Sequence, residues 1–164
     1  KNLPLSAANN VSQTENDVFG LSGKLRESLG HRPDTHVIGS LFLVPTDILF
    51  ATGSADLNPA AQTALSKLAQ TLYEVAAEIP SQLDWVLRID GHTDKRPINT
   101  PEFPSNWELS AARAISVLKY LEADGVSAQH LVAAGFGDSR PIDTADTDEA
   151  YAKNRRIEFK LTDG

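Results

Sequence analysis

From residue 36 onward, the spacing of apolar residues alternates between the two-residue period of a strand and the longer period of a helix. Residues 37–44 form a near-continuous apolar run of strand length. Pro45 interrupts this run before residues 48–50 resume it, which predicts a strand with a kink or a short hairpin. Three later segments also have strand character: residues 85–90, 131–136 and 157–161.

Two segments between these strands have apolar residues at helical spacing. The first begins at Asn58 and Pro59, a capping residue followed by a residue suited to the first helical turn. The second begins at Ser105, where Glu108 completes a capping-box pattern, and Gly125 is predicted to end it. The apolar stripes are Leu65, Leu68, Leu72, Val75, Ala76 and Ile79 in the first helix, and Trp107, Ala111, Ala114, Ile115, Leu118 and Leu121 in the second.

This order of elements predicts one α/β (α+β) sandwich, β-α-β-α-β-β, with a mixed sheet and helices on one face. We assign this domain to residues 36–164. Residues 1–35 are polar and poorly periodic, which predicts a linker with a marginal helix. Residues 137–154 are a polar excursion between the last two strands. Trp85 and Trp107 are predicted to pack the helices onto the sheet.

The composition narrows the classes of function. Fifteen Lys and Arg against 22 Asp and Glu give a net charge of -7, which argues against a nucleic-acid partner. The absence of Cys excludes disulfides and Cys-ligated zinc. The chain opens at Lys1 and contains no Met, so we expect a fragment or a processed form, with room for a signal peptide or membrane anchor upstream.

The segment from Gly91 to Ala114 carries the most chemical information. Thr93 and Asp94 follow the end of a predicted strand, where ligands collect in open α/β sheets. Asn106 and Arg113 share one face of the next predicted helix, which can present them beside Asp94. A carboxylate and a guanidinium on either side of one cleft suit a zwitterion such as an amino-acid head group.

A structural role for the same residues stays open. In that reading Asp94 and Arg113 bond to each other or to local backbone and only hold the loop in place. Arg155, at the entry to the last strand, is assigned an ancillary role that is either structural or directed at a ligand. The sequence also lacks the patterns of a metal site, a Gly-x-Ser-x-Gly nucleophile or a complete dinucleotide loop, so no cofactor and no catalytic set is expected.

Several ordered motifs carry a resemblance to a known family. They are Gly91-His92-Thr93-Asp94, Asn106, Leu109-Ser110, Arg113-Ala114, Ala134-Gly135-Phe136-Gly137 and Asn154-Arg155-Arg156-Ile157-Glu158. Over residues 45–162 the chain resembles the OmpA-like peptidoglycan-binding domain, and the run Phe103–Ser110 is similar to its MotB branch, the cell-wall anchors of ion-driven stator complexes.

The resemblance implies non-catalytic binding of the peptidoglycan stem peptide at its diaminopimelate residue. By position, the binding aspartate of the family falls on Asp94, its arginine on Arg113 and its helix-start asparagine on Asn106. The chain departs from the family's pattern at two places. The segment between Asp94 and Asn106 is long and rich in proline, and Gly53 stands where many lipoprotein-type relatives place an acidic residue. The candidate ligand-binding residues are Thr93, Asp94, Asn106, Leu109, Arg113 and Arg155.

The same resemblance predicts where the protein works. It implies the periplasmic part of a single-span inner-membrane protein, with residues 1–35 as the connector, a homodimer, and a channel subunit reached through a missing N-terminal region. Two alternatives remain: a wall anchor of the outer-membrane lipoprotein type, and an envelope interaction domain whose cleft no longer binds a ligand.

Overall fold

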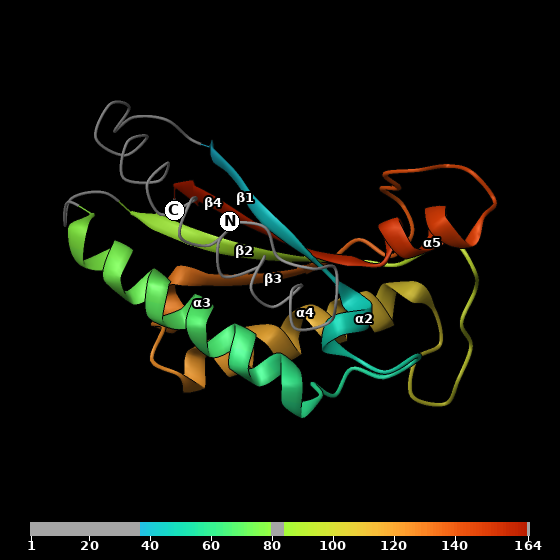
Figure 1. Ribbon diagram of the computed structural model, residues 1–164, viewed down its shortest axis with the longest axis horizontal. Helices are drawn as coiled ribbons and strands as arrows, with labels where there is room; N and C mark the ends of the chain where they lie inside the picture. Colours follow the sequence, from blue (N-terminus) through green and yellow to red (C-terminus); the bar gives the residue numbers. More distant parts are fainter. Residues whose placement is uncertain (1–36, 80–83, 164) are drawn as a thin grey trace, which may run out of the picture.

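The computed structural model describes residues 37–79 and 84–163 (Figure 1). The predicted linker, residues 1–35, lies outside this part of the chain. The strands are β1 (Val37–Pro45), β2 (Trp85–His92), β3 (Leu131–Gly135) and β4 (Arg156–Asp163). They form one sheet in the order β1-β4-β2-β3, in which only β2 and β3 are parallel neighbours. The mixed sheet predicted from the element order is therefore confirmed.

Both predicted helices are present and lie on the same side of the sheet (Figure 1). Helix α3 (Pro59–Glu78) begins after Asn58, whose Oδ1 accepts the backbone N–H of Ala61 at 2.8 Å. Helix α4 (Asn106–Ala123) begins after Ser105, whose hydroxyl oxygen accepts the backbone N–H of Trp107 at 3.1 Å. These caps satisfy backbone donors that the first turn of a helix leaves without a partner.

The hydrophobic core lies between the sheet and these two helices. Side chains at alternate positions of β2 and β4 point toward the helices, while the intervening positions, apart from Val86, carry charged or polar groups. The buried core includes Leu87, Ile89, Ile157, Phe159 and Leu161 from the sheet, with Leu65, Leu68, Leu72, Ala114, Val117 and Leu121 from the helices.

The predicted apolar stripe of α4 is partly wrong. Trp107 is 54% exposed and Ile115 is 43% exposed, so neither belongs to the core. The helix instead buries Leu109, Ser110 and Arg113 together with Ala114, Val117 and Leu121. Hydrogen bonds allow the polar side chains of Ser110 and Arg113 to be buried. The buried face of α4 is therefore rotated about the helix axis from the face that its apolar residues alone indicate. Trp85 does pack inside, where its ring stacks on His130.

Three short helical elements were not predicted. Residues 46–49, assigned to an interrupted strand or hairpin, form helix α2 (Thr46–Leu49), a single turn. The polar excursion contains helix α5 (Asp148–Asn154), whose preceding Thr147 accepts the backbone N–H of Ala150. A 3₁₀ turn, η1 (Ala128–His130), precedes β3.

Two glycines allow α4 to approach the sheet closely. A Cβ atom on Gly91 would lie 2.3 Å from the carbonyl oxygen of Ser110, and one on Gly135 would lie 2.6 Å from the backbone nitrogen of Ala111. Only glycine fits such a contact between two backbones. The first turns of α4 are thereby held against the carboxyl ends of β2 and β3.

Candidate functional site

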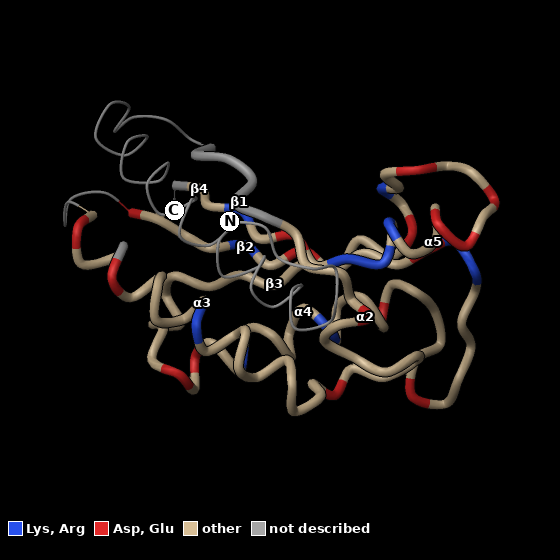
Figure 2. Tube along the Cα trace, in the orientation of Figure 1, with Lys and Arg blue, Asp and Glu red and all other residues tan. Residues whose placement is uncertain are grey.

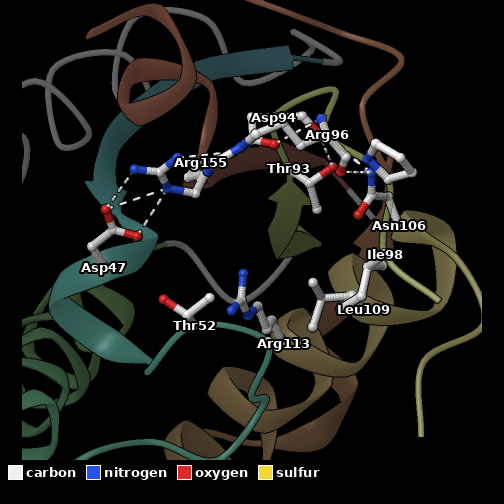
Figure 3. A pocket seen from close by; sticks show the side chains of 12 residues that line it. Asp47, Thr52, Thr93, Asp94, Arg96, Ile98, Asn106, Leu109, Arg113 and Arg155 are labelled. Atoms are coloured by element: carbon white, nitrogen blue, oxygen red, sulfur yellow. Dashed lines mark hydrogen bonds and ion pairs between the residues drawn. The ribbon is translucent and has the colours of Figure 1, made fainter. Parts of the chain in front are cut away.

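A pocket of about 410 Å³ opens beside the carboxyl end of β2 (Figure 3). It lies between the loop after β2, the start of α4, and the segment that follows α2. All six residues that the sequence indicated line it: Thr93, Asp94, Asn106, Leu109, Arg113 and Arg155. The lining also contains Asp47, Thr52, Gly53, Arg96, Pro97 and Ile98.

Asp94 is 5% exposed, and its carboxylate is surrounded by donors. Oδ1 accepts the backbone N–H of Arg96 at 2.9 Å, while Oδ2 accepts Nη2 of Arg96 at 2.7 Å and Nη1 of Arg155 at 2.7 Å. Burial raises the pKa of Asp94, but hydrogen bonds from Arg96 and Arg155 outweigh it and hold the pKa below its ordinary value. Asp94 is therefore an anion near neutral pH.

Arg155 forms hydrogen bonds with both aspartates of the pocket, Asp47 and Asp94. Its Nε and Nη2 donate to the carboxylate of Asp47, each at 3.0 Å, while Nη1 donates to Asp94 (Figure 3). Hydrogen bonds to Asp47 and Asp94 raise the pKa of this guanidinium despite its partial burial. Arg155 thus fixes α2 relative to the loop after β2, and most of its donors are already used.

Arg113 is held differently. Its Nε donates to the carbonyl of Ser54 at 2.8 Å and its Nη2 to the carbonyl of Ala51 at 3.2 Å. The guanidinium is 5.3 Å from the ring centroid of Phe50, and the side chain is 5% exposed. Burial lowers its pKa, and within the described residues no carboxylate forms a salt bridge with it. A buried guanidinium in this state gains strongly from an anionic ligand.

Asp94 and Arg113 both line the pocket and do not bond to each other (Figure 3). The structural role in its first form, a direct pair, is therefore wrong, whereas the backbone contacts of both side chains agree with its second form. Each does bond to protein groups, so the expected single anion facing a single cation is also incomplete. Three arginines and two aspartates line the pocket, which leaves an excess of one positive charge.

The remaining predicted residues shape the site. Nδ2 of Asn106 donates to the carbonyl oxygens of Asp94 and Arg96, at 3.3 and 3.1 Å, and so ties α4 to the loop. The hydroxyl of Thr93 donates to the carbonyl of Asp94 at 2.9 Å. Leu109 supplies a buried apolar wall. Asn106 and Thr93 thus hold the backbone of the loop that presents Asp94.

Two charged groups of the pocket were missed from the sequence. Arg96 lies only two residues after Asp94, and its position in the loop was the available signal. Asp47 lies far away in sequence and reaches the pocket because α2 replaces the expected strand. A one-turn helix is too short to show a helical period, so no pattern in the sequence indicated it.

A second charged cluster lies outside this pocket, on β2 and β4. Ligand atoms of Asp90, His92 and Glu158 lie within 4.8 Å of one another. Arg88 pairs with Asp90 at 2.8 Å and Arg156 pairs with Glu158 at 2.5 Å, so these carboxylates are already neutralised. Burial, followed by the charge of Arg156, lowers the pKa of His92 to about 4. Lys160 also lies 3.4 Å from both carboxylates, so three cations surround two anions beside a neutral imidazole, unlike a cation site.

Charge elsewhere on the molecule differs from that in the pocket. Acidic positions gather along the polar excursion and α5 (Figure 2). In the described part of the chain, no helix has both the length and the apolar character needed to cross a bilayer. The cationic character of the pocket is thus a local property within an acidic protein.

The model of the OmpA family matches residues 49–155, and the chain belongs to this family. Motility protein B of Bacillus subtilis is 42% identical over 74 residues, which cover 44% of this chain and 28% of that protein. The peptidoglycan-associated lipoprotein of Pseudomonas aeruginosa is 34% identical over 115 residues, covering 70% of this chain and 61% of that protein. The chain spans less than half the length of the first curated relatives that it matches.

Solved structures agree with this assignment and confirm the fold. The periplasmic domain of Helicobacter pylori MotB has a TM-score of 0.65 at 27% identity, covering 74% of this chain and 81% of that one. The cell wall anchor of the T6SS from P. aeruginosa has a TM-score of 0.66 at 30% identity, covering 85% and 97%. The chain is thus an OmpA-family domain with relatives among MotB proteins and peptidoglycan-associated lipoproteins.

Proposed function

We propose that this domain binds peptidoglycan without catalysis, by holding the diaminopimelate residue of a stem peptide between Asp94 and Arg113. The observation that carries the proposal is that these two buried, oppositely charged side chains line one pocket and remain apart. A diaminopimelate side chain ends in an ammonium group and a carboxylate on one carbon, so it can contact both. The names of the relatives, a peptidoglycan-associated lipoprotein and a cell wall anchor, support the same polymer.

The contacts of Arg113 favour a carboxylate as one of the two ligand groups. Backbone carbonyls of Ala51 and Ser54 orient its guanidinium and occupy Nε and Nη2. No hydrogen bond joins its Nη1 to another residue in the described ranges. A ligand carboxylate can therefore bond to Nη1 without displacing a protein partner, and the charge on both groups strengthens that bond.

We also propose the setting in which this binding acts. The domain would anchor a MotB-like inner-membrane protein to the cell wall from the periplasmic side. Residues 1–35 would connect the wall-binding domain, residues 36–164, to a membrane segment and a channel subunit. A homodimer would engage two stem peptides of one polymer, which raises avidity through effective concentration and makes modest affinity per pocket sufficient.

A second anchor class has its own support. The match to a peptidoglycan-associated lipoprotein covers 70% of this chain, close to the 74% covered by the match to motility protein B of Helicobacter pylori. A lipoprotein-type anchor in the outer membrane would use the same pocket. The full-length reading frame separates the two: a lipidated cysteine before the domain favours the lipoprotein class, and a hydrophobic span favours the MotB class.

Sedimentation with purified, diaminopimelate-containing sacculi tests the binding function. Asp94→Ala and Arg113→Lys should both reduce the fraction that pellets. The first removes the carboxylate that contacts the ligand amine, and the second removes Nη1 together with the bonds that orient it. Losing one partner of a desolvated charged contact costs about 2–5 kcal/mol, which is enough to abolish weak binding. Circular dichroism at the assay temperature establishes that each variant is folded.

Asp90→Ala is the matched control. Asp90 is also a buried aspartate bonded to an arginine, but it lies outside the pocket lining. This variant should lose stability and keep wild-type pelleting. Equal pelleting of wild type and of folded Asp94→Ala and Arg113→Lys proteins would overturn the proposed site.

A further inference from the structure

The carboxylate of Asp94, which would bind a ligand amine, already accepts hydrogen bonds from two arginines. Arg96 donates to Asp94 through its backbone N–H, its Nε at 3.2 Å and its Nη2 at 2.7 Å. Arg155 adds Nη1 at 2.7 Å on Oδ2, the same oxygen that receives both side-chain donors of Arg96. A ligand ammonium at Oδ2 must therefore replace one of these guanidinium groups.

The two arginines differ in how easily they can be replaced. The Arg155 side chain is 22% exposed and keeps three hydrogen bonds to Asp47 if it leaves Asp94. That anchor keeps it beside Asp94. The Arg96 side chain is 57% exposed, and its further side-chain neighbour is the ring of Tyr151, whose centroid lies 5.0 Å from the guanidinium carbon. Arg96 is thus the group that can swing from Asp94 into water or onto a ligand.

Replacing Arg96 with an amine alone brings little net gain. One cation exchanges for another on the same carboxylate, and the displaced guanidinium loses its partner. A ligand with a carboxylate next to its amine compensates for this loss. Its carboxylate can accept hydrogen bonds from the displaced Arg96 or from Arg113. The excess positive charge of the pocket also favours a ligand group with this added negative charge.

We propose that Arg96 determines specificity, by competing for Asp94 so that only an amine with an adjacent free carboxylate binds well. This inference rests on the proposed function and names the ligand class for the same pocket: a diamino acid whose distal carboxylate is ionised. Stem peptides that end in lysine, or in diaminopimelate with an amidated distal carboxylate, retain the amine and lack that anion. They bind more weakly because they leave Arg113 without its anion and, in addition, do not compensate for the displacement of Arg96.

Calorimetric titration of the 164-residue chain with three synthetic stem tripeptides tests this role. The peptides end in diaminopimelate, in lysine, and in diaminopimelate amidated at its distal carboxylate. Wild type should bind the first about tenfold or more tightly than either of the others. In Arg96→Gln, the lysine peptide should bind more tightly than it does to wild type, and the diaminopimelate peptide should not. The preference should therefore narrow by more than twofold, while the contact of Arg113 with the ligand carboxylate keeps part of it.

Lys95→Gln is the matched control, since it removes one positive charge from the neighbouring residue. Lys95 pairs with Asp146 and does not line the pocket, so the preference should remain. If Arg96 is only structural, Arg96→Gln changes all three affinities by a common factor and leaves their ratios within about twofold of wild type, which overturns the inference. Equal binding of the three peptides by wild type also overturns it while leaving the proposed function intact. Binding of none of them means that the proposed function itself has failed.

Discussion

Replacing Gly91 by alanine should move helix α4, which carries Arg113, away from the loop after β2, which carries Asp94. The backbone of Gly91 is outside the left-handed region, so alanine meets no conformational penalty there. Its Cβ, however, would lie 2.3 Å from the Ser110 carbonyl oxygen, where ordinary contact begins at 3.4 Å. Helix α4 and β2 must then separate by about 1 Å, and such overpacking costs about 1–3 kcal/mol. The shift carries Arg113 away from Asp94.

Urea unfolding and titration with a diaminopimelate stem tripeptide, carried out on the same samples, measure both effects. Gly91→Ala should unfold at lower urea and bind about tenfold more weakly, the loss of roughly one charge-assisted contact. Gly125→Ala is the control, because its Cβ has room, 3.8 Å from Tyr73, but its φ of +110° strains alanine by about 1–3 kcal/mol. That variant should lose stability and keep its affinity. Wild-type affinity in Gly91→Ala, or an equal loss of affinity in Gly125→Ala, would refute the reasoning.

Two further predictions concern the fold. Folding lowers the pKa of His92 from its ordinary value of 6.5 to about 4. Between these two pH values the imidazole binds a proton in the unfolded chain and does not bind it in the folded chain. His92 should therefore make stability fall as pH drops from 6.5 toward 4, by at most about 1.4 kcal/mol per pH unit, and urea unfolding of His92→Phe should show a shallower pH dependence. Leu121→Ala should lower the unfolding free energy by about 2–5 kcal/mol because Leu121 is fully buried. Ile115→Ala, at 43% exposure, should cost less than about 1 kcal/mol; similar losses for the two variants would contradict the observed face of α4.

Much of the fold was predictable because its main elements have strong local signals. Asn58 and Ser105 cap helices, and the alternation around Leu87 and Phe159 indicates strands with one buried face. The order of these elements then determines that a strand end and a helix start meet. That juxtaposition is why the sequence predicts Asp94 and Arg113, 19 positions apart, beside one cleft, where the structure also has them.

The sequence could not indicate contacts that depend on tertiary packing. Trp107 was assigned to the core because hydrophobic periodicity treats Ser110 and Arg113 as solvent-facing. Arg113 is buried through carbonyl groups of the segment after α2, and Ser110 through its bond to the N–H of Gly137. Such bonds between distant segments leave no periodic pattern. Arg96 was missed for the same reason, and Arg155 was indicated without its partners Asp47 and Asp94, since a sequence does not show which charges share a carboxylate.

We propose that the pocket between Asp94 and Arg113 receives the diaminopimelate of a stem peptide. Nuclear magnetic resonance titration of the isotope-labelled chain with a diaminopimelate stem tripeptide tests it most directly. We expect saturable shifts confined to residues around the pocket, such as Thr93, Leu109 and Arg113, and their loss in Asp94→Ala. Shifts centred instead on the exposed apolar residues Trp107, Ile115 and Val132, or no shifts at saturating peptide, would contradict it.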